Sequence, residues 1–335
     1  MSNDPAIDRV EKGALLEGAE AVAQEETITI PILGINLPKA GFPLLVAGLV
    51  ACLALGWAFL RQLPAIWFED EGYYSHGILI PFMSLAVIYM RRDRIRSEPI
   101  VTSWFGLPIL VIGLLMVLAG QKIDNISFAS GGFIVSLIGG SYFVFGSRVT
   151  RHVVGPLLFL AFMMPVLGWI IDSTTNPLQL ISTKVAAKLL TIFGFNAEIP
   201  AAYPTLILMD NYSLYVGGPC SGFKLILSLT AFTMFFVMIS NLGLWKNLLL
   251  VFVINPALAL LINGLRIMLI GIAGERSIIT PDAAWVGWMR SLDKTKDDVG
   301  MIFHDYSGYL TLIVCFIVLH YIVRGLEGKR HEVAA

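Results

Sequence analysis

The chain has 335 residues, of which 56% are hydrophobic and only 14% are charged. An ordinary soluble surface cannot accommodate that many apolar side chains, so the composition excludes a soluble globular protein and indicates an integral membrane protein. The net charge of -1 and the lack of a basic patch with interleaved aromatic residues give no sign of a nucleic-acid partner.

Residues 1–38 are polar and acidic, and the first long apolar run begins near residue 41. A cleavable signal peptide would begin with a short basic region, so we do not expect one here. The composition of this segment instead predicts a mostly disordered tail. We expect this tail and the C-terminal residues 326–335 to be cytoplasmic, on either side of one transmembrane domain over residues 39–325.

Apolar runs of about 20 residues recur along this domain, and each is long enough to cross a bilayer core of about 30 Å as a helix. The pattern predicts an all-α polytopic membrane protein with about eight transmembrane helices. These runs lie near residues 41–60, 72–90, 103–120, 127–146, 153–171, 222–240, 247–272 and 305–323.

Arginines cluster in the loop RRDRIR (residues 91–96), at Arg148 and Arg151, and in the C-terminal tail. Because basic residues of short loops stay on the cytoplasmic side, these clusters predict that both termini are cytoplasmic. The long connections 172–221 and 273–304 then lie on the outer face. The connection 273–304 also contains basic residues, although the rule would place such residues on the cytoplasmic side.

The connection 172–221 is too long for a simple turn. Asn176 followed by Pro177 predicts an N-cap and a first helical position. Apolar residues then recur at steps of three and four opposite lysines, which predicts a helix lying in the membrane interface. After it, the runs PTLILM and YSLYVGG on either side of Asp210-Asn211 predict a short extended hairpin.

The three cysteines are not equivalent. Cys52 and Cys315 lie inside apolar runs, where a thiol behaves as a small hydrophobic group. Cys220, in the stretch GGPCSGFK, lies at the outer end of the predicted span 222–240, where unpaired backbone N–H groups and the helix dipole favour a thiolate. This local stretch alone leaves two readings open, a reactive thiol or an interfacial cysteine in a turn.

Topology places two further reactive side chains at the depth of Cys220. Arg266 lies near the outer end of the span 247–272, and an arginine inside an apolar run is costly unless it pairs, lines a polar cavity or reaches the head groups. His304 opens the last span on the same face. Together they suit acyl transfer, with Cys220 as nucleophile, His304 as general acid and base, and Arg266 stabilising the oxyanion or the thiolate.

Other residues near this face have weaker signals. His76 lies at the outer end of the second predicted span, where it either shapes a substrate cleft or meets the head groups. Asp305 follows His304, but adjacent helical residues face different ways, so we do not expect it to orient the imidazole. The sequence has no HExxH, GxSG or Walker motif and no paired catalytic aspartates on apolar helices, which argues against the common intramembrane proteases and pumps. It has no metal-ligand spacing either, so we expect no metal and no other cofactor.

Four segments occur in an order that resembles the successive signatures of the exosortase/archaeosortase family. They are YYSHGILIPF (73–82), PCSGFK (219–224), NGLRI (263–267) and HDYSGY (304–309). The resemblance implies that Cys220 is the nucleophile, with Arg266 and His304 at the other two catalytic positions. The third position is an arginine in many archaeal members, so the histidine at position 304 resembles the bacterial exosortase branch. Gly218 and Pro219 differ from the acidic residue and alanine that often precede the nucleophile.

The resemblance implies a function as well as a site. A protein of this kind recognises a C-terminal sorting tail on exported proteins, made of a short Pro-containing motif, a transmembrane helix and a basic cluster. It cleaves the tail through a thioester and transfers the new carboxyl end to an acceptor that the sequence does not identify, a lipid- or glycan-linked group being the candidate. Proteins of this kind are linked to exopolysaccharide loci. It lies in the cytoplasmic (inner) membrane with its active site facing outward. The residues expected to bind substrate are His76, Ser221, Gly222, Lys224 and Asn263.

Two alternatives stay open at this point. The first is a protease that resolves the same acyl-enzyme with water. The second, from a different class, is a non-enzymatic carrier or binder of lipid-linked glycans in which Arg266 grips an anionic head group.

Overall fold

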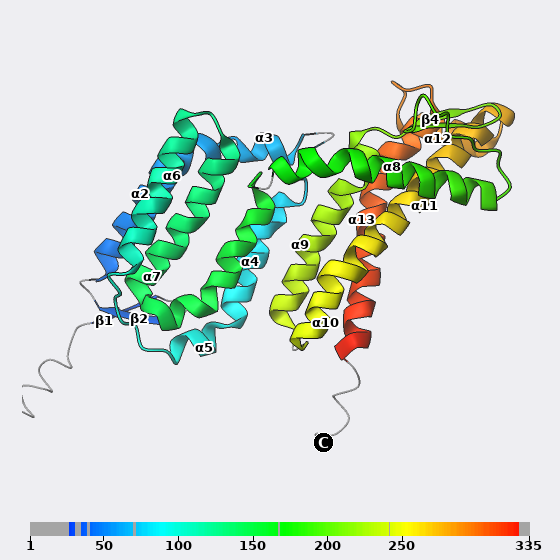
Figure 1. Cartoon of the computed structure of the whole chain (residues 1–335). Helices are drawn as coiled ribbons and strands as arrows, with labels where there is room; N and C mark the ends of the chain where they lie inside the picture. Colours follow the sequence, from blue (N-terminus) through cyan, green and yellow to red (C-terminus); the bar gives the residue numbers. More distant parts are fainter. Residues whose placement is uncertain are drawn as a thin grey trace, which may run out of the picture.

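The computed structural model describes residues 27–30, 35–38, 41–69, 72–166, 168–240 and 242–327. The fold is built from helices, with two short hairpins and several single helical turns (Figure 1). In chain order the larger elements are α2 (Gly41–Leu60), α3 (Leu63–Trp67), α4 (Ile80–Met90), α5 (Arg92–Arg96), α6 (Gly106–Lys122), α7 (Ile126–Phe159), α8 (Gly168–Ile192), α9 (Phe223–Ile239), α10 (Leu244–Leu249), α11 (Asn255–Ile279), α12 (Ala284–Leu292) and α13 (Val299–Glu327). The single turns are η1 (Gly77–Leu79), η2 (Leu160–Met163), η3 (Gly218–Ser221) and η4 (Leu250–Ile254).

Within the described residues, 3 helical runs are long and apolar enough to cross a membrane. They are Ile126–Met163, Leu244–Ile279 and Val299–Glu327. Shorter apolar helices cover Val46–Leu60, Gly77–Met90, Gly106–Lys122 and Phe223–Ile239. This is a helical membrane protein; the number of about eight spans and the cytoplasmic position of both ends stay predictions.

Helix α7 changes direction at Gly146, whose backbone angles (φ 79°, ψ 179°) are not helical. A Cβ at this position would collide with the carbonyl oxygen of Val101, so both the conformation and the space require glycine. The first part of α7 therefore runs beside α6, and the second part runs back beside α4 (Figure 1). The predicted run 127–146 ends at this kink.

Helix α8 corrects the prediction for the outer connection. It begins at Gly168, and Pro177 lies inside the helix rather than at its start. One turn before the proline, the hydroxyls of Thr174 and Thr175 donate to the carbonyls of Ile170 and Ile171 at 2.5 and 2.6 Å. A proline removes one backbone bond, and the neighbouring bonds carry the helix past it. Figure 1 shows α8 running across the ends of α9 and α11.

Strands β3 (Leu206–Leu208) and β4 (Ser213–Tyr215) pair antiparallel, with Leu206 opposite Tyr215. Asp210 and Asn211 lie in the turn, and Asn211 donates its backbone N–H and its side-chain amide to the carboxylate of Glu275 on α11 at 2.7 to 3.2 Å. The hairpin packs on α8 and α11 through a core that contains Leu190, Ile207, Leu214, Val216 and Ile267. It lies at the end of the molecule opposite α5 and α10 (Figure 1).

A second pair, β1 (Thr27–Ile30) and β2 (Ile35–Pro38), is antiparallel and lies inside the segment predicted to be a disordered tail. Residues 1–26 of that segment, and the C-terminal residues 328–335, lie outside the described residues. The domain limits at residues 38 and 325 stay predictions.

Candidate active site

Cys220 lies in the single turn η3, between β4 and α9. The turn ends at Gly222, which adopts the left-handed conformation (φ 86°, ψ -3°) and is the N-cap of α9. A side chain would strain this conformation, so glycine lets the chain pass from the turn directly into the helix. Cys220 is partly exposed at this junction, and its backbone N–H donates to the carbonyl of Gly217 at 3.1 Å.

Two buried side chains hold this turn from α8 and α11. Asn263, only 1% exposed, donates its amide to the carbonyl of Cys220 at 2.9 Å and to the hydroxyl of Ser182 at 3.1 Å. Ser182 in turn donates to the carbonyl of Ser221 at 2.8 Å. Because these groups are buried, each bond would be costly to lose, and together they fix the backbone that carries the thiol.

The thiol of Cys220 meets the imidazole of His304, 84 residues later in the chain. The sulfur lies 2.8 Å from Nε2. The other ring nitrogen, Nδ1, lies 3.0 Å from a carboxylate oxygen of Asp305. An ionised carboxylate only accepts hydrogen bonds, so Nδ1 carries the ring proton and Nε2 can accept the proton of the thiol. The tautomer required of a general base is thus set by Asp305.

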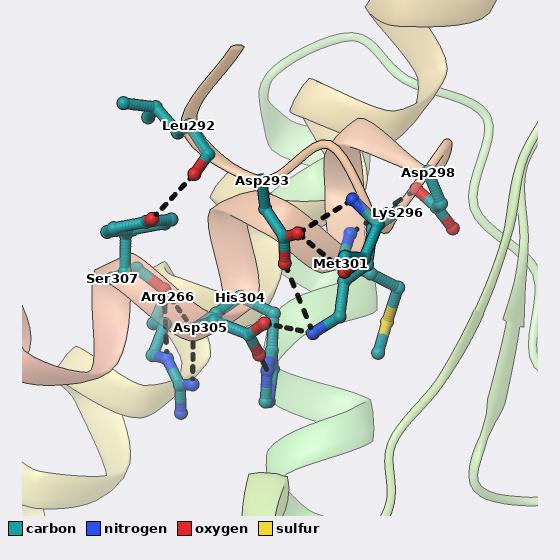
Figure 2. A network of polar contacts seen from close by, with 11 residues as sticks. Arg266, Leu292, Asp293, Lys296, Asp298, Met301, His304, Asp305 and Ser307 are labelled. Atoms are coloured by element: carbon teal, nitrogen blue, oxygen red, sulfur yellow. Dashed lines mark hydrogen bonds and ion pairs between the residues drawn. The ribbon is translucent and has the colours of Figure 1, made fainter. Parts of the chain in front are cut away.

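The expectation that Asp305 would not orient the imidazole is wrong, because its carboxylate contacts Nδ1 although the two residues are adjacent on α13. The reason is that Nδ1 lies close to the backbone, where a short carboxylate of the next residue can reach it. Asp305 also forms an ion pair with Lys296, which comes from the loop before α13 (Figure 2). Lys296 lies 4.0 Å from Asp293 as well. The carboxylate is therefore held from both sides.

Arg266 holds the backbone of α13 beside the imidazole. Its Nε donates to the hydroxyl of Ser307 at 3.1 Å and its Nη2 to the carbonyl of His304 at 3.0 Å (Figure 2). The guanidinium also interacts electrostatically with Cys220 and Asp305. This arrangement puts a positive charge near the thiol and ties α11 to the first turns of α13.

A pocket of about 340 Å³ opens at the thiol. It lies between the segment that runs from β4 to η3 and the facing sides of α11 and α13. Its lining residues are Leu214, Tyr215, Val216, Gly217, Gly218, Cys220, Ile267, Ile270, Met301 and His304. The pocket is mostly apolar, and the cysteine and the histidine are its reactive groups.

The residues expected to bind substrate lie behind or beside this pocket rather than on its wall. Ser221, Gly222 and Asn263 build the turn that carries the thiol. His76 is 4% exposed, and its Nδ1 lies 2.9 Å from the hydroxyl of Ser228 on α9, so it packs inside the protein instead of meeting head groups. Lys224 lies in the first turn of α9.

Sequence reasoning missed three residues of the site, Asp305 as a contact of the imidazole, Ser182 and Ser307. Asp305 has a signal in its position next to His304. The two serines have no such signal, because the hydrogen-bond partner of a hydroxyl on one helix can be identified only when the facing element is known. Among the described residues, no group of three His, Cys, Asp or Glu side chains is placed to hold a metal ion.

Comparison with known proteins gives one family. The family model "Transmembrane exosortase (Exosortase_EpsH)" matches residues 67–321, which include Cys220, Arg266 and His304. Searches of curated proteins and of solved structures give no match. The matched segment covers most of the chain and all of the pocket, and it supports a membrane transpeptidase type of enzyme that acts on exported proteins. The chain belongs to the transmembrane exosortase family.

Proposed function

We propose that this protein is a membrane-embedded cysteine transpeptidase that cleaves C-terminal sorting tails of exported proteins through a thioester intermediate. The observation that carries the proposal is the 2.8 Å contact between the sulfur of Cys220 and Nε2 of His304 at the wall of one pocket. A thiol and an imidazole within hydrogen-bonding distance, with the imidazole oriented by a third group, are the arrangement that nucleophilic catalysis requires.

The reaction begins with proton transfer from Cys220 to Nε2 of His304. The thiolate attacks the carbonyl carbon of the scissile peptide bond, and a tetrahedral oxyanion forms. Its collapse breaks the C–N bond, while His304 returns the proton to the leaving amine. The thioester left on Cys220 is then attacked by an acceptor, from which His304 removes a proton, and the thiol is restored.

Asp305 and Arg266 support this cycle without meeting the scissile bond. The Asp305 carboxylate stabilises the imidazolium that forms when the thiol loses its proton. Arg266 fixes the backbone of His304 and supplies a positive charge that favours the thiolate over the thiol. Two of its donors are engaged by α13. This engagement favours the enzyme over the alternative, a carrier that grips an anionic lipid-linked glycan through Arg266.

The substrates in this proposal are exported proteins whose tails carry a short motif, a transmembrane helix and a basic cluster. Such a tail would place the motif at the membrane surface, beside the pocket. The protein then lies in the cytoplasmic membrane with the pocket on the outer face, and the acceptor is an amine or hydroxyl presented at that surface.

Replacing Cys220 with alanine and with serine tests the proposal. A tail-bearing protein of the same cell is followed by its molecular weight, and both variants are expected to leave it unprocessed. Cys315→Ala is the matched control, because that thiol is buried (1% exposed) among apolar side chains of α9, α11 and α13. Processing by Cys220→Ala at the rate of Cys315→Ala would refute the enzyme and favour the carrier.

The chemistry at the new C-terminus separates transfer from hydrolysis. Mass spectrometry of the processed protein should show an added group on the terminal carboxyl carbon. A free carboxylate on every product molecule would instead assign a protease that uses water as the acceptor.

A further inference from the structure

One side of the pocket is the edge of a β-strand. β4 pairs with β3, and this pair is the whole of its sheet within the described residues. The backbone bonds from Val216 N–H to the Thr205 carbonyl and from Met209 N–H to the Tyr212 carbonyl, both 2.8 Å, show which groups of this segment face β3. Backbone groups alternate in direction along an antiparallel strand. The peptide groups of Ser213 and Tyr215 therefore face away from β3.

The free edge faces the reactive pair across the pocket. β4 and the two glycines that follow it line the pocket, whereas none of the described lining residues comes from β3. The opposite wall is formed by α11 and α13, including His304. The space beside the unpaired edge of β4 is thus the same space into which the thiol of Cys220 opens.

We infer that the edge of β4 binds the substrate peptide as an added strand, with its scissile carbonyl at Cys220. This inference rests on the proposed function, and it names the surface that holds the substrate. Extended peptides add to exposed sheet edges through backbone hydrogen bonds, and their side chains enter pockets on alternate sides.

Three features of the pocket fit an extended peptide as the occupant. Unpaired N–H and C=O groups along a strand edge are satisfied by another strand about 4.8 Å away. A strand of the length of Ser213–Tyr215 spans about 10 Å, enough for a motif of about three residues. Gly217 and Gly218 then carry no side chains where the peptide backbone must pass to reach Cys220.

The apolar wall adds a preference for side chains. Ile267, Ile270 and Met301 line the pocket beside the edge, so alternate residues of the bound peptide meet apolar surface. The backbone bonds hold any extended sequence, and the apolar wall selects small or apolar residues near the scissile bond.

Labelling of Cys220 by a peptide electrophile tests this binding mode on the purified full-length protein. The probe is acetyl-trialanine with a C-terminal vinyl sulfone, to which the thiolate adds while a proton reaches the adjacent carbon. Ethyl vinyl sulfone, which has no peptide, reports the reactivity of the thiol alone. The labelled fraction is measured by intact mass at successive times, and the label is assigned to Cys220 by its absence in Cys220→Ala.

N-methylation of one alanine at a time removes one N–H of the probe. If the peptide adds as a strand, methylation slows labelling about tenfold at residues whose N–H faces β4 and has little effect at the residues between them. The effect therefore alternates along the three alanines. Equal rates for the parent and all three methylated probes would overturn the inference.

The bond that runs the other way, from the Tyr215 N–H to a carbonyl of the peptide, is removed by Tyr215→Pro, while Tyr215→Ala deletes only the side chain. A proline is tolerated on a free edge because its nitrogen takes no part in the ladder to β3. The trialanine probe should label the proline variant about tenfold more slowly than the alanine variant. Ethyl vinyl sulfone should label both at one rate, and equal labelling by the peptide probe would contradict the inference.

Failure of the proposed function has a different signature. In that case Cys220 reacts slowly with both electrophiles, and Cys220→Ala processes tails normally. Rapid labelling by both probes with no response to N-methylation rejects the strand edge alone. Should Tyr215→Pro fail to fold, the methylated series on the unaltered protein still decides.

Discussion

Replacing Gly222 with alanine tests whether the turn that carries Cys220 is held by Asn263. Gly222 has a φ of 86°, and a Cβ there would lie 3.0 Å from the amide nitrogen of Asn263. The same amide donates to the Cys220 carbonyl and to Ser182. An alanine at this position is therefore expected to strain the backbone and to displace the amide.

Gly194 provides a matched control, because its φ of 84° is nearly the same and nothing lies within 4 Å of a Cβ built there. It lies just beyond the end of α8 at Ile192, where the Phe195 N–H donates to the Leu190 carbonyl at 3.0 Å. An alanine in the left-handed region costs about 1–2 kcal/mol at either site. At Gly222 two hydrogen bonds of the Asn263 amide weaken as well, each worth about 1 kcal/mol. The difference between the variants is thus about 2 kcal/mol.

Unfolding of both variants in detergent, followed by helical circular dichroism, measures the loss of stability, and tail processing measures the site. Gly194→Ala is expected to lose stability but to process the tail at an unchanged rate once folded. Gly222→Ala is expected to lose more stability and to process at least tenfold more slowly. Equal stability and equal processing in the two variants would show that Asn263 does not hold the turn.

Three further changes probe the contacts around the imidazole and one distant ion pair. Asp305→Asn should slow processing about 10- to 100-fold and shift its pH profile, whereas Asp305→Glu should restore part of the rate. We expect a loss no larger than this because the Asp305 side chain is 41% exposed, and solvent weakens its interaction with the imidazole. Arg266→Lys keeps the positive charge but loses the fixed pair of Nε and Nη2 donors that bond the Ser307 hydroxyl and the His304 carbonyl, so processing should fall at least tenfold. Arg276→Lys on the exposed side of α11 should leave processing unchanged, and equal rates for the two variants would remove Arg266 from the site. Hydrogen bonds from His152 and Arg151 hold the pKa of Glu98 below its usual range, so its stabilising contribution is present above pH of about 4.3 and is lost as the pH falls through the lower folded value. As the pH falls through this range, the unfolding temperature of the protein should approach that of Glu98→Gln. A constant difference between the two unfolding temperatures would contradict the hydrogen bonds of Glu98.

Composition and hydrophobic runs predict the class of this protein well, because the bilayer requires about 20 apolar residues in each helix that crosses it. Boundaries are predicted less well where tertiary contacts decide them. Pro177 indicates the start of a helix in the sequence, but α8 begins at Gly168. Helix α8 continues upstream of this proline, and nothing in the spacing of apolar residues there predicts the additional turns.

The reactive residues of the site have sequence signals because burying them carries a cost. A charged arginine in an apolar run is costly unless it pairs or lines a polar site, and a thiol at the start of a helix is favoured as a thiolate. Supporting residues have no such signal, since Ser182 and Ser307 are ordinary on any helix surface. Their importance follows only from the facing groups, the Ser221 carbonyl and the Arg266 guanidinium.

Asp305 shows why a rule about helix faces can mislead at a histidine. The rule concerns the ends of side chains, which point in different directions at adjacent positions. Nδ1 is bonded to the ring carbon nearest the backbone, so a carboxylate on the next residue can reach it while Nε2 still points toward Cys220. The sequence His-Asp at the start of a helix therefore permits two arrangements, an aspartate turned to solvent or one that fixes the imidazole tautomer. Here the second arrangement is present, and Asp305 contacts both Nδ1 of His304 and the ammonium group of Lys296 (Figure 2). We expect the ion pair with Lys296 to help hold Asp305 on the side of the helix where His304 lies. Lys296→Met should then reduce processing, and most of this reduction should vanish in an Asp305→Asn background, whereas an equal reduction in both backgrounds would contradict the role of the ion pair.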